Sequence, residues 1–162
     1  KGYGPEDSEH NLKLYTKYGL FPHLTIMVGY YWQTRDQLEK TIATVKRFMF
    51  EGIARTLQVT LCTPIDFTPY HQECLDKKAL LTDNYDDFDM SKLIVKTPLP
   101  HNIYYDAIRE MYSIAFHPKF MLKQIQFLTR FKKKDWQFLF TYGIRAIRRV
   151  RQHIFNLTKH QK

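Results

Sequence analysis

Cys62, His71 and Cys74 are the residues whose types could hold a metal ion most directly. Their spacing is C-x8-H-x2-C. A structural zinc site needs four ligands, which usually come in closely spaced pairs. This spacing matches no common zinc finger and offers no fourth ligand. We therefore expect no metal site among these residues.

A cluster of carboxylates, in the segment TDNYDDFDMS, is the second candidate for metal chemistry. A calcium-binding EF-hand loop places a glycine at its sixth position and a glutamate at its twelfth. This segment has neither, so we expect a solvated loop in which acidic side chains cap short turns. The acidic residues are Asp83, Asp86, Asp87 and Asp89.

The segment around Gly29 is the strongest candidate for a binding site. An apolar run over residues 24–28 ends on Gly29, and three aromatic residues follow at positions 30–32. In parallel α/β folds, ligands bind where the strands end and the strand-to-helix loops begin. Two interpretations are open: a loop that faces a ligand, or a structural turn whose aromatic side chains fill space between sheet and helices.

Hydrophobic periodicity and capping residues predict the elements that position this segment. Thr34 and Gln37 form a capping box, which predicts a helix that ends at Gly52. Its inward stripe is Leu38, Ile42, Val45 and Met49. Thr68 and Pro69 predict the start of another helix. Further helices are expected at residues 5–18, 100–116, 118–131 and 135–156, and strands at residues 20–28 and 56–62.

This alternation of helices and strands predicts a parallel sheet. The continuous apolar strand at residues 20–28 is typical of a strand covered on both faces. Two strands make no stable sheet alone, so we expect part of a larger α/β barrel or open sheet. On an inward-facing side of such a barrel, His23 and Thr25 would stand at alternate positions. The chain opens on Lys1 rather than Met, and we expect a piece of a longer protein.

Composition predicts a folded cytoplasmic protein. Of the 162 residues, 44% are hydrophobic and 15% aromatic. The sequence contains no apolar run of roughly 18 residues that would span a bilayer and no N-terminal signal core. The cysteines, Cys62 and Cys74, are too few for a disulfide framework.

Charge divides the chain. Residues 119–162 hold twelve Lys and Arg against one acid, whereas residues 1–118 hold thirteen against fifteen. Three interpretations of the basic tail are open: a helical lid packed on the body, a surface that binds an anionic membrane, and a surface that binds nucleic acid phosphates. Bulky apolar residues suit a lipid interface better than a phosphate groove. These residues are Phe120, Leu122, Ile125, Phe127, Leu128, Trp136, Phe138, Leu139, Phe140, Ile144, Ile147 and Ile154.

Several segments together resemble one enzyme family. VGYYWQT resembles the strand-end G-x-P-x-E-T segment of radical S-adenosylmethionine enzymes, particularly those with an upstream cobalamin-binding domain. KGYGPEDSEHNLKLYTKYGL is similar to the helix before that strand. TLQVTLCTPIDFTPYHQECLDKKALLTDNYDDFD is similar to the next strand, its PYPGTP loop, helix and acidic segment. MYSIAFHPKFMLKQI and GIRAIRRVRQHI resemble the aromatic and Arg-rich helices of the family tail.

The resemblance implies a fold and a binding site. Residues 1–82 would be the C-terminal half of a TIM-type barrel, residues 83–99 an acidic connecting loop, and residues 100–162 a basic helical extension. S-adenosylmethionine would contact the ends of both strands. The residues implied are Gly29, Tyr30, Gln33, Thr34, Leu61 and Thr63. The chain departs from the family where Tyr31 and Gln33 replace Pro and Glu, and where Asp66 and Phe67 replace Pro and Gly.

The resemblance also implies cofactors that this chain cannot hold alone. A four-iron four-sulfur cluster in this family is bound by a CxxxCxxC loop, which is absent here and is expected upstream. A cobalamin domain would also lie upstream. The chain would then be inactive alone and would need the upstream half of the same polypeptide. Its substrate would be an organic molecule, for which a lipid-like compound is one option, with peripheral membrane contact.

Overall fold

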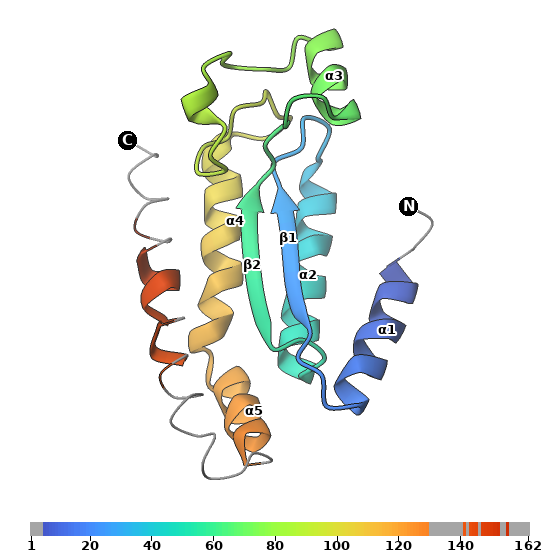
Figure 1. Ribbon diagram of the computed structural model, residues 1–162, viewed down its shortest axis with the longest axis vertical. Coiled ribbons are helices and arrows are strands. Elements are labelled where there is room, and N and C mark those ends of the chain that lie inside the picture. The colour runs from blue at the N-terminus through green and yellow to red at the C-terminus, as the bar shows by residue number, and fades with distance from the viewer. Residues whose placement is uncertain (1–4, 130–140, 142, 146, 153–154, 156–162) are drawn as a thin grey trace.

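A computed structural model describes residues 5–129, 141, 143–145, 147–152 and 155 of the chain. Helices and strands alternate through the first half, and helices follow (Figure 1). The elements are α1 (Pro5–Lys17), β1 (His23–Val28), α2 (Arg35–Glu51), β2 (Thr56–Leu61), α3 (Pro69–Asp76), the 3-10 turn η1 (Tyr85–Asp87), α4 (His101–Ser113), the 3-10 turn η2 (Ile114–Phe116) and α5 (Pro118–Leu128).

The two strands pair in parallel, which confirms the prediction of a parallel sheet. Their register runs from His23 opposite Thr56 to Val28 opposite Leu61. Within the described residues these are the only strands, and a single antiparallel bridge between Leu80 and Val95 lies outside them.

Local sequence signals explain where the helices begin and end. The Thr34 side chain accepts a hydrogen bond from the Gln37 N–H, and the Gln37 side chain accepts one from the Thr34 N–H. This is the predicted capping box. Gly52 ends α2 in the left-handed region, at φ 75°. Thr68 caps α3, with Pro69 in its first turn.

Within the described part of the chain the sheet is covered on one face, whereas the sequence predicted a strand covered on both faces. Its inner face is apolar, with Leu24, Val28, Val59 and Leu61 buried. Residues between them, such as Thr25 and Gln58, are exposed. The strand also starts at His23 rather than at residue 20. The apolar run misled because Leu20 and Phe21 precede the strand and are themselves exposed.

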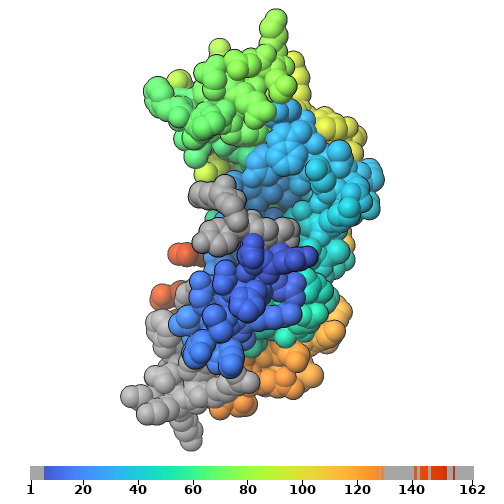
Figure 2. Space-filling view, turned by 90° about the vertical axis from the view of Figure 1, so that its right-hand side faces the viewer, coloured from blue at the N-terminus to red at the C-terminus, as the bar shows by residue number. Residues whose placement is uncertain are grey.

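Helices α2 and α4 cover the apolar face, on the far side of the strands in Figure 1. The Tyr112 hydroxyl of α4 donates to the Val59 carbonyl (3.1 Å) and accepts from the Val59 N–H (2.9 Å). Helix α1 packs beside α2, where Arg47 forms paired hydrogen bonds to the Glu9 carboxylate (2.6 and 2.8 Å). Figure 2 shows α1 in front of the C-terminal part of α2. Helices α2 and α4 thus lie behind the sheet, and α1 lies beside it next to α2.

Helix α5 lies at the amino end of the strands, opposite α3, while α4 and the described residues between 141 and 155 run alongside the strands (Figure 1). The predicted helix at 100–116 ends at Ser113 and tightens into η2. In α5, Phe120 and Phe127 are buried. The described residues between 141 and 155 are helical, as predicted, and Val150 packs against the core.

Part of the basic tail lies outside the described residues, including Trp136, Phe138, Leu139, Phe140 and Ile154. Across the part of the chain that the structure describes, no helix has both the length and the apolarity to cross a bilayer.

Candidate functional site at the carboxyl edge of the sheet

The loops that follow β1 and β2 meet at the carboxyl edge of the sheet, beneath α3 (Figure 1). The Cys62 N–H donates to the Val28 carbonyl (2.7 Å), which extends the pairing beyond the strands. The Tyr31 N–H donates to the Tyr70 hydroxyl oxygen (3.3 Å), which joins the first loop to α3. The fold thus brings together the two segments that the sequence singled out.

The loop after β1 is closed by its own residues. Gly29 has φ 89°, a conformation that favours glycine. Its N–H donates to the Gln33 Oε1 atom (2.7 Å), and the Gln33 N–H donates to the Tyr30 carbonyl (3.0 Å). The Tyr104 hydroxyl of α4 donates to the Gln33 carbonyl (3.1 Å). A Cβ atom on Gly29 would stand 2.4 Å from the Leu93 Cδ1 atom. The close approach at Gly29 is thus made by a protein side chain.

Aromatic rings cover this loop. Tyr30 stacks on Trp32 with ring centroids 4.8 Å apart and meets the edge of Tyr70 at 5.5 Å. Tyr31 stacks on the other side of Tyr70, at 6.1 Å. The Tyr31 hydroxyl also donates to the Glu73 carboxylate, which raises the pKa of Tyr31 to about 12. Trp32 remains half exposed, so the cluster presents a flat aromatic surface at the sheet edge.

The two thiols beneath the rings have low reactivity. Cys62 and Cys74 are free and buried. Burial raises the pKa of Cys62 to about 11 and also raises the pKa of Cys74. A thiol acts as nucleophile or metal ligand only as the thiolate. His71, the third residue of the candidate zinc group, has its Nε2 atom 3.2 Å from an Asp66 oxygen. Among the described residues, no three His, Cys, Asp or Glu side chains gather in a way that could hold a metal ion.

The loop after β2 contains a polar group that the described residues leave without a hydrogen-bond partner. Thr63 is buried, and its Oγ1 atom has no hydrogen-bond partner within the described part of the chain. A buried polar atom without a partner is rare and costs free energy. Phe67, at the tip, has φ 62° and a fully exposed side chain. This is the position where the resembling family has glycine, so the backbone conformation fits glycine while the residue does not.

The uncovered face of the sheet leads up to this edge. In the parallel register Thr25 stands beside Gln58 and Met27 beside Thr60. His23 Nδ1 lies 2.7 Å from the Thr56 hydroxyl oxygen. Side chains paired in register point to the same face, so this face is uncharged and mostly polar, apart from any charge on His23.

The six residues implied to contact S-adenosylmethionine thus differ in what they can still bind. The Gly29 N–H and the Gln33 side chain bond each other in the first loop, and the Thr34 hydroxyl caps α2. The Leu61 side chain is buried in the core. Tyr30 is half-buried with its ring stacked on Trp32, and Thr63 has a hydroxyl without a hydrogen-bond partner among the described residues. Nothing in the sequence pattern pointed to Leu93, Tyr70 and Tyr104, because each reaches the site across distant elements.

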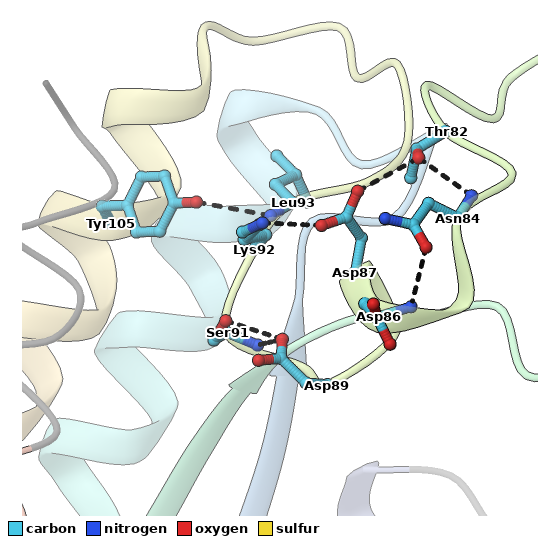
Figure 3. Close-up of polar contacts among 9 residues, drawn as sticks. All are labelled: Thr82, Asn84, Asp86, Asp87, Asp89, Ser91, Lys92, Leu93 and Tyr105. Atoms are coloured by element: carbon cyan, nitrogen blue, oxygen red, sulfur yellow. Dashed lines mark hydrogen bonds and ion pairs between the residues drawn. The ribbon is translucent and has the colours of Figure 1, made fainter.

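Several acidic side chains of the connecting loop form hydrogen bonds within the loop (Figure 3). Asp87 accepts from Lys92 (2.6 Å) and from the Thr82 hydroxyl (3.1 Å), and these bonds lower the pKa of Asp87. Asn84 caps η1 through the Asp86 N–H (3.2 Å). The Tyr105 hydroxyl of α4 accepts from the Leu93 N–H (3.3 Å). The loop thereby anchors Leu93 and Val95, which are buried although they fall within the predicted connecting loop.

Comparison with known proteins matches the chain to no protein-family model, no curated protein and no solved structure. The assignment of a function therefore depends on the residues and on the geometry of this edge.

Proposed function

We propose that the chain is the C-terminal portion of a radical S-adenosylmethionine enzyme and contributes cofactor and substrate contacts at the carboxyl edge of β1 and β2. The chain would be part of an enzyme and inactive alone. Catalysis would require an upstream half of the same polypeptide, with the iron-sulfur cluster and, in the cobalamin-dependent type, a cobalamin domain.

The observation that carries the proposal is the one-sided cover of the sheet. Helices α2 and α4 cover one face of the strands, and within the described residues the opposite face of both strands is exposed and mostly polar. In a TIM-type barrel all helices lie outside and the uncovered strand face looks into the interior. Met27, which is half exposed, and its neighbours would then line the substrate side of a barrel wall. An uncharged wall of this kind favours a neutral substrate.

The S-adenosylmethionine contact would come from the loop after β2. Thr63 supplies a buried hydroxyl that still lacks a partner among the described residues, and the Tyr30 and Trp32 rings supply stacking surface. Both fit a purine, which has hydrogen-bonding edges and a flat π face. Gly29 would contribute by shaping the turn, because the space next to it is filled by Leu93.

The iron-sulfur cluster does not fit the residues described. Three thiolates would hold it and leave one iron for the methionine portion of the cofactor. Cys62 and Cys74 are too few and are buried as neutral thiols. The ligands of a cluster would belong to a segment before Lys1.

The first test is the reading frame before Lys1 together with cluster reconstitution. It should encode CxxxCxxC, and the present chain, reconstituted anaerobically with iron and sulfide, should hold no stoichiometric cluster. An upstream frame without this motif, or a four-iron cluster on this chain alone, would overturn the proposal.

The second test is Thr63→Val in the longer protein. Losing one hydrogen bond to the cofactor should weaken S-adenosylmethionine binding about two- to tenfold. Because the hydroxyl has no partner in the chain, the melting temperature should stay equal or rise. Thr41→Val makes the same change on α2, away from the candidate site, and serves as the control. It should leave binding unchanged. Equal affinities for both variants, measured by calorimetry, would argue against a ligand at Thr63.

A further inference from the structure

Helix α5 turns an apolar face to solvent. Its inward side is formed by Phe120 and Phe127, which are buried seven residues apart. Met121, Leu122 and Ile125 are 51%, 57% and 57% exposed. Residues three and four apart share one side of a helix, so these three side chains form a single ridge that faces away from the core.

Basic residues accompany this ridge. Lys119 and Lys123 lie four residues apart on the same helix. Lys119 places its ammonium 5.5 Å from the Phe50 ring, and Lys123 lines a cavity of about 240 Å³ between α2 and α5. The Lys119 ammonium is thus held near the body, while Met121, Leu122 and Ile125 are exposed.

The second part of this surface comes from residues 141–155. Val150 packs against the same core as Phe120. On the rest of this helical segment, Ile144, Ile147 and Phe155 are exposed. Exposed arginines alternate with them, at positions 145, 148, 149 and 151. Within the described residues from 117 to 155 no side chain is acidic.

The combination of apolar and basic side chains indicates which binding partner fits this surface. A groove for nucleic acid needs cations facing phosphates, whereas three of the exposed side chains of α5, Met121, Leu122 and Ile125, are large and apolar. An acidic bilayer surface accepts both components, because the ridge enters the acyl boundary and the cations remain at the headgroups. The net charge of +11 over residues 119–162 complements such a surface.

We propose that α5 and the described helical residues 143–145 and 147–152 form a peripheral binding surface for an anionic lipid bilayer. In Figure 1, α5 lies at the end of the molecule opposite α3 and the candidate site, and the described residues between 141 and 155 lie beside α4. The inference is independent of the proposed enzymatic function, since it requires none of the residues at the carboxyl edge.

Co-sedimentation of the chain with vesicles tests the proposal. The probes are vesicles of phosphatidylcholine alone and of phosphatidylcholine with phosphatidylserine. The chain should bind the second kind only. Binding should fall as salt shortens the Debye length from about 10 Å at 0.1 M to about 3 Å at 1 M.

Two sets of variants separate the components of the surface. Leu122→Glu with Ile125→Glu should lower vesicle partitioning at least about tenfold, because the two apolar side chains that would be buried in the bilayer are lost. Arg148→Gln and Arg151→Gln should each lower it about fivefold. Leu75→Glu is the control: it adds a charge at an apolar residue of α3 that is 46% exposed, and it should leave binding unchanged.

Circular dichroism and thermal melting should show that every variant remains folded, as expected for exposed positions. Equal recovery with both kinds of vesicle, or recovery with neither, would overturn the proposal. So would vesicle binding by the Leu122→Glu, Ile125→Glu variant at the original strength. Binding of heparin or RNA that this variant keeps, in a chain that ignores vesicles, would identify a polyanion surface instead.

Discussion

The two strand-to-helix loops at the carboxyl edge differ in how completely their polar groups are used. After β1, the Gly29 N–H and the Gln33 carbonyl both have partners, and the one residue at positive φ is glycine. After β2, the Thr63 hydroxyl lacks a partner among the described residues, and the residue at positive φ is Phe67.

The difference assigns separate tasks to the two loops. A loop whose groups are satisfied internally, as the first is, fixes where the strand ends and where α2 begins. Strain and unused polar groups persist only where the surrounding structure supports them, and they gather at binding sites. The second loop is therefore the better candidate for ligand binding, although the aromatic run at residues 30–32 is more conspicuous in the sequence.

Gly29→Val should have the largest effect on stability. The positive φ costs a β-branched residue about 1–3 kcal/mol, and displacing Leu93 adds a similar amount, so we expect a loss of about 2–5 kcal/mol in the free energy of unfolding. Urea denaturation measures it. Gly19→Val is the matched control, because Gly19 has φ 78° but nothing within 4 Å of an added Cβ.

The gap between these two valine variants isolates the Leu93 contact. Leu93→Ala in the Gly29→Val background should recover part of the loss beyond what Leu93→Ala alone predicts. Equal losses at Gly19 and Gly29 would show that the first loop has room beside Gly29 for a ligand, and the contrast between the loops would weaken.

Gln33→Leu should have the next largest effect. Leucine has a similar size but no acceptor, so the buried Gly29 N–H would lose its partner at a cost of about 1–3 kcal/mol. Gln37→Leu makes the same chemical change at an exposed position of the capping box and should cost about 0.5 kcal/mol. Urea unfolding of the pair should rank Gln33 well above Gln37. The reverse order would mean that the first loop is held mainly by the helix cap.

Much of the local structure could be predicted from the sequence. The caps at Thr34, Gly52 and Thr68 depend on neighbouring residues alone, so their patterns were sufficient. Helical spacing likewise identified the stripe of α2, of which Leu38, Val45 and Met49 are buried.

The partners that determine the site could not be predicted in this way. Leu93 reaches Gly29 from a loop more than sixty positions later, and Tyr104 reaches Gln33 from α4. Such contacts depend on tertiary packing, which has no local period. The one-sided cover of the sheet was missed for a related reason: an apolar run records composition, whereas burial in β1 alternates with residue position.

Phe67→Gly should have the smallest effect, with the opposite sign. A left-handed conformation costs a non-glycine residue about 1–2 kcal/mol, and the added freedom of glycine in the unfolded chain returns part of it, which leaves a gain of about 0.5–1 kcal/mol. The exposed phenyl ring has no packing to lose. Phe67→Ala is the control: it removes the ring but keeps the strain, so its stability should match that of the native chain. A gain for glycine alone, measured by urea unfolding, would show that the second loop carries strain that folding does not require. A loss for both variants would mean that the ring supports the loop, and that the two loops are equally structural.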